Sequence, residues 1–93
     1  MVEDKERLIM EIRFSDYAEK KMNRFKYLNE YDVEDYVRDK VEEDSFQDFL
    51  EECYGAVNNE FYYEDYDVTI YSTVKSNIVT IDDVRRGKPD FID

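Results

Sequence analysis

The spacing of apolar residues changes twice along this chain, and these changes limit the folds that it can adopt. Residues 7–14 (RLIMEIRF) and 67–74 (DVTIYSTV) alternate apolar and polar side chains, as does a strand with one buried face. Between these segments the apolar residues recur every three or four positions, as on the buried side of a helix. Strands near both ends and helices in the middle predict an α+β domain.

Three helices are predicted in the middle of the chain. Each follows a residue whose side-chain oxygen can accept a hydrogen bond from the first turn. The predicted helices cover residues 16–29, 33–43 and 46–59, after Ser15, Asp32 and Ser45. We expect the third helix to bury Phe46, Phe49, Leu50, Cys53, Tyr54 and Val57.

The end of the sequence predicts a hairpin followed by one helical turn. Residues 75–77 are typical of a short turn, and residues 78–81 (IVTI) of the returning strand. We expect the tail from residue 82 to form a helical turn capped by Thr80. The predicted order is β-α-α-α-β-β. It gives an α+β fold in which a three-stranded, mostly antiparallel sheet packs against about three helices, in one domain of residues 1–93.

The composition excludes several kinds of chemistry. The 93 residues include no histidine and only one cysteine, Cys53, so no Cys–His nucleophile pair and no internal disulfide can form. No glycine-rich phosphate loop occurs, and the acids match no calcium-loop spacing. We therefore expect no enzymatic activity, no cofactor and no metal. A metal-dependent enzyme using the acids is the weakest alternative.

The sequence also bears on where the protein works. Its first residues, MVEDKERL, lack the pattern of a secretion signal, and no apolar run approaches the length of a membrane span. We expect a cytoplasmic protein that does not contact a membrane. If a phage encodes it, the compartment is the cytoplasm of the host cell.

Negative charge is concentrated in the middle of the chain. The net charge is −12, and residues 41–74 contain ten acids but no lysine or arginine. Acids three or four positions apart on the predicted helices repel each other, at a cost on the order of 1–3 kcal/mol in sum. A solvated face is the simplest interpretation of such a run, but mixed charges would give solubility without this cost.

We expect the acids to form a face that binds a cationic protein surface, with tyrosine rings that stack on arginine. The same surface would repel nucleic acid, so no direct nucleic-acid binding is expected. Lys20, Lys21, Arg24 and Lys26 are expected to form a solvated helix face. The predicted partner-binding residues are Glu34, Asp35, Asp39, Glu42, Glu43, Asp44, Asp48, Glu51, Glu52, Glu60, Glu64, Asp65, Asp67, Tyr63 and Tyr66.

The stretch VEEDSFQDFLEECYGAVNNEFYYEDYD resembles phage anti-defence proteins that mimic DNA, such as the anti-restriction nuclease (Arn) family of T-even phages. The resemblance lies in length, charge distribution and composition, mainly over residues 30–67. It implies a homodimer that occupies the DNA-binding site of a host defence protein, either a restriction endonuclease of the McrBC type or a CRISPR effector. The alternative is an acidic protein-interaction module, such as an antitoxin or a transcription modulator, that binds a basic protein surface.

Overall fold

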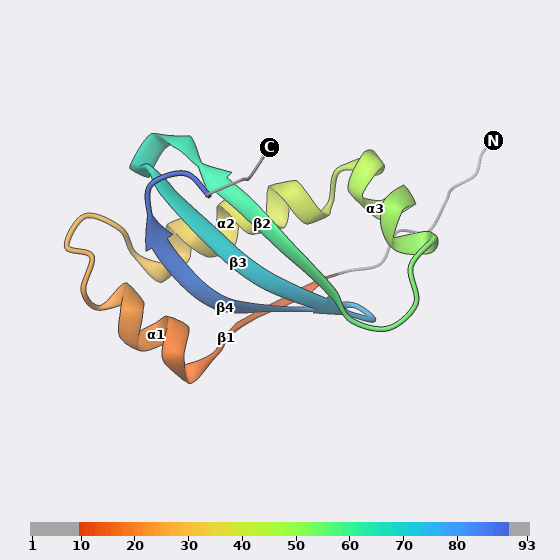
Figure 1. Cartoon of the computed structure of the whole chain (residues 1–93), viewed down its shortest axis with the longest axis horizontal. Helices are drawn as coiled ribbons and strands as arrows, with labels where there is room; N and C mark the ends of the chain where they lie inside the picture. The colour runs from red at the N-terminus through yellow and green to blue at the C-terminus, as the bar shows by residue number, and fades with distance from the viewer. Residues whose placement is uncertain (1–9, 90–93) are drawn as a thin grey trace.

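The strands of the computed structural model, which describes residues 10–89, form one four-stranded sheet in the order β1-β4-β3-β2 (Figure 1). Strand β1 runs parallel to β4, and the other neighbouring pairs are antiparallel. The α+β class is confirmed, but the sheet has four strands where three were predicted. The elements in chain order are β1 (Glu11–Phe14), α1 (Asp16–Met22), α2 (Glu30–Val41), α3 (Asp44–Glu51), β2 (Val57–Tyr63), the short 3-10 helix η1 (Glu64–Tyr66), β3 (Val68–Lys75) and β4 (Ile78–Arg86).

Strand β2 is the element that the sequence pattern did not predict. Its first residues were assigned to the end of a helix over 46–59, whereas α3 ends at Glu51 and Gly55, with φ +80°, lies in the connection. Asparagine and paired aromatic residues are poor helix formers, and Val57 to Tyr63 pair in register with Val74 to Val68. The extra strand follows from this long-range pairing.

Three helix boundaries also differ from the prediction. Helix α1 ends at Met22 rather than continuing to residue 29. Helix α2 is capped by Asn29, whose Oδ1 accepts the Asp32 N–H at 2.8 Å, so Asp32 lies within the first turn. Helix α3 starts at Asp44 with Glu43 as its N-cap, so Ser45 is not the cap.

The hairpin of β3 and β4 is confirmed, but the predicted helical turn after it is wrong. Residues 82–86 continue β4 and pair with β3 through an irregularity next to Tyr71. Val84 is fully buried opposite Ile70 of β3, and this contact keeps the segment in the sheet. The predicted residues 7–9 of the first strand and 90–93 of the tail lie outside the described residues.

Helix α2 and the sheet form the core. Val33, Val37 and Val41 on one side of α2 are fully buried, and they belong to the same apolar cluster as Ile70 of β3 and Ile81 of β4. The buried apolar residues recur every four positions on α2 and every second position on the strands. These two spacings in the sequence therefore mark the sides of α2 and of the sheet that face each other in the core. Helix α3, by contrast, contributes no buried residue.

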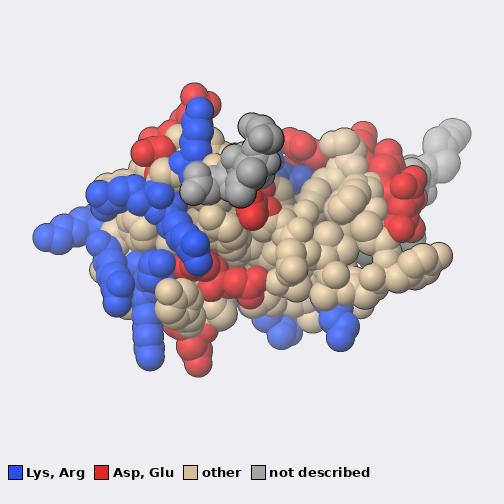
Figure 2. All heavy atoms as spheres, viewed as in Figure 1, with Lys and Arg blue, Asp and Glu red and all other residues tan. Residues whose placement is uncertain are grey.

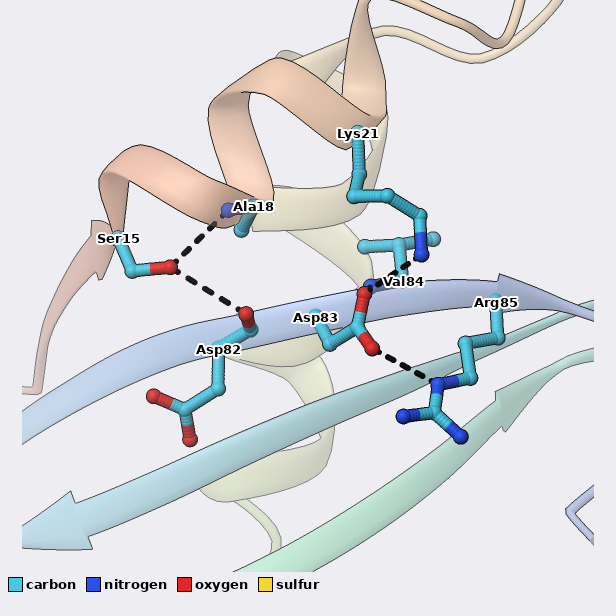
Figure 3. A network of polar contacts seen from close by, with 7 residues as sticks. All are labelled: Ser15, Ala18, Lys21, Asp82, Asp83, Val84 and Arg85. Atoms are coloured by element: carbon cyan, nitrogen blue, oxygen red, sulfur yellow. Dashed lines mark hydrogen bonds and ion pairs between the residues drawn. The ribbon is translucent and has the colours of Figure 1, made fainter.

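A polar network fastens α1 to β4 (Figure 3). Ser15 caps α1 as predicted by accepting the Ala18 N–H at 3.0 Å, and its hydroxyl donates to the Asp82 carbonyl at 3.3 Å. Asp83 accepts hydrogen bonds from Lys21 at 2.9 Å and from Arg85 at 2.8 Å. Lys21 is therefore an internal ion-pair partner rather than part of a solvated face.

The pKa of Asp83 reflects this network. Burial alone would raise the pKa of a carboxyl group. The hydrogen bonds from Arg85, Lys21 and the Val84 N–H favour the charged form and outweigh burial, so the pKa of Asp83 lies below its ordinary value. The network thus needs an ionised carboxylate.

Candidate protein-interaction surface

Charged side chains are unevenly distributed on the face shown in Figure 2. Lysine and arginine side chains gather at one end, over α1, the loop that follows it and the end of β4. Aspartate and glutamate side chains follow the edge that carries η1 and α3. The fold therefore brings many of the central acids to one edge of the molecule.

A groove lies between α2 and the end of β2 with η1, and its volume is about 520 Å³. We call it the acidic tyrosine groove. Helix α2 contributes two acids one turn apart, and η1 contributes two adjacent acids. The residues that line the groove are Asp35, Tyr36, Asp39, Lys40, Tyr62, Tyr63, Glu64 and Asp65.

Stacked aromatic rings hold the two sides of this groove together. The rings of Tyr36 and Tyr63 are parallel within 8° and their centroids are 4.1 Å apart. The Tyr36 hydroxyl donates to the Tyr62 carbonyl at 2.6 Å, and Tyr66 packs edge-on against Tyr63 at 5.0 Å. These contacts between tyrosines connect α2 to β2 and η1 along the groove.

The tyrosine hydroxyls near the groove keep their protons at neutral pH. Burial, followed by the charges of nearby groups, raises the pKa of Tyr63. The charge of Asp32, 3.4 Å from the Tyr66 hydroxyl, raises the pKa of Tyr66. A hydrogen bond of 2.5 Å to Asp67 raises the pKa of Tyr62 to about 12. These phenols remain neutral donors beside ionised carboxylates.

Some acids of α2 are neutralised within the protein. Arg38 contacts Glu34 at 3.0 Å and Glu42 at 3.9 Å, and Lys40 contacts Glu43 at 3.8 Å. Within residues 10–89, no lysine or arginine pairs with Asp35 or Asp39 in this way. Arg38 and Lys40 therefore offset the charge of three predicted partner-binding acids: Glu34, Glu42 and Glu43.

The structure brings together only some of the predicted residues. Asp35, Asp39, Tyr63, Glu64 and Asp65 meet in the groove, and Tyr66 packs behind Tyr63. Four predicted residues lie on or directly after α3, a separate part of the acidic edge: Asp44, Asp48, Glu51 and Glu52.

Two predicted residues lie apart from the groove for local reasons. Glu60 lines a hollow with Tyr71 and Asp82, because the strand alternation turns it away from Phe61, which packs on the core. Asp67 accepts a hydrogen bond from Tyr62 and is the positive-φ residue between η1 and β3.

Two groove residues were not predicted from the sequence, Tyr36 and Lys40. The helical spacing of Tyr36 with Val33 and Val37 indicates a buried position, and nothing in the sequence near Tyr36 indicates a partner on β2. The useful signal was the spacing of Tyr36, Asp39 and Lys40, which places them on neighbouring parts of one helix surface.

The described ranges contain no group of three or more His, Cys, Asp or Glu side chains placed to hold a metal ion. No helix in residues 10–89 has the length and apolar character needed to cross a membrane.

Comparison with known proteins assigns no family to this chain. No protein-family model matches it, and no curated protein matches it. A solved structure described as "Chromosomal ParDE TA system from P. aeruginosa" aligns with 86% of this chain and 98% of its own, at 15% sequence identity and a TM-score of 0.48. At that identity and TM-score, the similarity establishes neither a shared fold nor a shared function.

Proposed function

We propose that this chain is a non-enzymatic protein-interaction module whose acidic tyrosine groove binds a basic surface of a partner protein. One observation carries the proposal. Asp35 and Asp39 face Glu64 and Asp65 across stacked tyrosines, and Lys40 is the one basic residue that lines the groove among the described residues. Carboxylates held close together repel one another unless cations compensate their charge.

An arginine side chain matches this groove in charge and shape. Its guanidinium group is planar, pairs with carboxylates through two hydrogen bonds and stacks on aromatic rings. Tyr36 and Tyr63 supply rings, and the acids on both sides supply carboxylates. The protein already contains related contacts, since Lys40 lies over the Tyr36 ring and Lys88 over the Tyr62 ring. At the groove, a partner's arginine would compete with Lys40 for the Tyr36 ring.

A narrower form of the proposal is a DNA mimic that blocks the DNA-binding site of a host defence nuclease. Asp35 and Asp39 are one helical turn apart, with Cβ atoms about 5–6 Å apart. Phosphates along one strand of DNA repeat about every 3.4 Å, a comparable scale. Arg38 and Lys40 pair with neighbouring acids, so fewer carboxylates of this region can imitate phosphates. The broader interaction module therefore has better support than the DNA mimic. An antitoxin or a transcription modulator would be other narrow forms.

The test is quantitative capture from a bacterial lysate with two matched variants. The groove variant carries Asp35→Asn, Asp39→Asn and Asp65→Asn. The control variant removes the same number of charges outside the groove, through Asp16→Asn, Glu19→Gln and Glu30→Gln. The proposal predicts proteins that the wild type and the control retain and that the groove variant loses. Equal retention by both variants would contradict the groove as the binding site.

The DNA-mimic form makes a stricter prediction. A captured partner should release this chain when saturating duplex DNA is added, because both ligands would occupy one basic surface. Retention of the complex in the presence of duplex would exclude mimicry while leaving the broader module intact. Sedimentation of the purified chain tests the homodimer that mimicry implies.

A further inference from the structure

Helix α3 presents apolar side chains that the fold does not bury. Phe46, Phe49 and Leu50 lie at helical spacing, yet none of the eight residues of α3 is buried. Phe49 is 47% exposed, and Tyr54, just after the helix, is 98% exposed. The prediction that Phe49, Tyr54 and Cys53 belong to the core is therefore wrong. Helix α3 touches the core only through its partly buried side chains: the Phe46 ring contacts the Phe61 ring of β2 with centroids 5.8 Å apart, and Leu50 also packs against the core.

A hollow of about 390 Å³ opens beside this exposed surface. It separates the end of α3 and its following loop from the ends of β2 and β3. The apolar residues around it are Leu50, Cys53, Tyr54, Val57 and Val74. This volume is large enough for an apolar side chain of a binding partner.

The rim of this surface is acidic. Asp48, Glu51 and Glu52 are exposed, and no described lysine or arginine pairs with them. A second copy of this chain would bring its own acids against these three, and the repulsion would oppose self-association. A basic partner would instead be attracted.

We propose that the surface formed by Phe49, Leu50, Tyr54 and the hollow beside them binds an apolar side chain from a basic segment of a partner protein. The apolar contact excludes water, and lysine or arginine residues flanking the anchor pair with Asp48, Glu51 and Glu52. Aromatic residues in such positions carry much of the energy of protein interfaces. The inference rests on the proposed function only for the basic character of the partner; the binding surface is separate from the acidic tyrosine groove.

A dye-labelled amphipathic peptide of leucine and lysine tests this surface, with fluorescence anisotropy as the readout. The double variant Phe49→Ser with Tyr54→Ser should bind this peptide at least about tenfold more weakly than the wild type. The matched control is Tyr17→Ser with Tyr31→Ser, whose side chains are 58% and 77% exposed elsewhere. Control binding should equal that of the wild type, and circular dichroism should be the same for all three proteins.

Three outcomes would overturn the inference. The first is equal peptide affinity in both double variants. The second is equal binding of a peptide in which serine replaces every leucine, since charge alone would then explain binding. The third is a wild-type dimer that dissociates in the Phe49 and Tyr54 variant, because a second copy would then occupy the surface. The groove variant described above should bind the peptide normally, so failure of the groove proposal is distinguishable.

Discussion

Asp83 is the residue on which the junction of α1 and β4 depends. Asp83 is 8% exposed, and its carboxylate pairs with Lys21 through one oxygen and with Arg85 through the other. Replacing Asp83 with asparagine leaves Lys21, a largely covered cation, without its charged partner. We predict that Asp83→Asn lowers the free energy of unfolding by about 1–3 kcal/mol at neutral pH, measured by urea denaturation.

The pH dependence of this effect has a defined direction. The folded pKa of Asp83 lies below the ordinary 3.8, so the unfolded chain binds its proton more readily. The stabilisation by Asp83 is therefore present at pH values above its ordinary pKa of 3.8, and it is lost as the pH falls through the lower pKa of the folded state. The difference in the free energy of unfolding between wild type and Asp83→Asn should therefore decrease in acid. A difference that stays constant with pH would exclude the ion pairs as its cause.

At the scale of elements, the contact of α2 with β2 builds the groove. The hydroxyl of Tyr36 on α2 donates a hydrogen bond to the Tyr62 carbonyl on β2, and the ring of Tyr36 stacks on Tyr63. Tyr36→Phe keeps the ring and removes the hydrogen bond, so we predict a loss of about 0.5–1.5 kcal/mol in stability. Tyr31→Phe, at a 77% exposed position, should change nothing in the same denaturation experiment. An equal loss in both would mean that the hydroxyl contact does not join the elements.

The position of α3 gives a second prediction about elements. Phe49→Ala should lower the free energy of unfolding by less than about 1 kcal/mol, because the side chain is 47% exposed. Ile70→Ala, at a fully buried position of β3, should cost about 2–5 kcal/mol. Thermal unfolding of both variants checks this, and similar losses would place α3 in the core after all.

Local patterns predicted part of this fold and contact between distant segments decided the rest. The Ser15 cap and the hairpin of β3 and β4 depend on neighbouring residues, and both were predicted. Strand β2 and the exposure of α3 were not, because Phe46 to Val57 fit a helical spacing equally well. Pairing of β2 with β3 then places the Tyr63 ring and the Tyr62 carbonyl against Tyr36 of α2, and no local pattern predicts this contact.

The candidate site was predictable in composition but not in arrangement. Asp35, Asp39, Glu64 and Asp65 were each expected to bind a partner, and the fold brings them to one groove. Ion pairs within α2 and the alternation of β2 remove others from it. The acids that reach the groove are decided by which side of α2 and which face of β2 they lie on. Both depend on how the complete chain folds.

At the scale of the molecule, the face shown in Figure 2 has many acids along one edge and many bases at one end. The molecule measures 46 Å along its longest axis, several times the Debye length of about 8 Å in physiological salt. The acidic tyrosine groove nevertheless lies beside the basic end, because Lys88 lies over the Tyr62 ring and the Gly87 N–H donates to the Asp67 carbonyl at 2.7 Å. A partner bound at the groove therefore experiences these bases as well as the acids. Lowering the salt concentration should strengthen binding at the groove mainly through Asp35, Asp39, Glu64 and Asp65.

The salt dependence of affinity for a captured partner tests this account most directly. The dissociation constants of the wild type, the groove variant and the charge-matched control are measured over a series of NaCl concentrations. We predict that affinity of the wild type and the control falls steeply with salt, and that the groove variant binds weakly with a much shallower dependence. Identical slopes for all three proteins would contradict the acidic tyrosine groove as the site of binding.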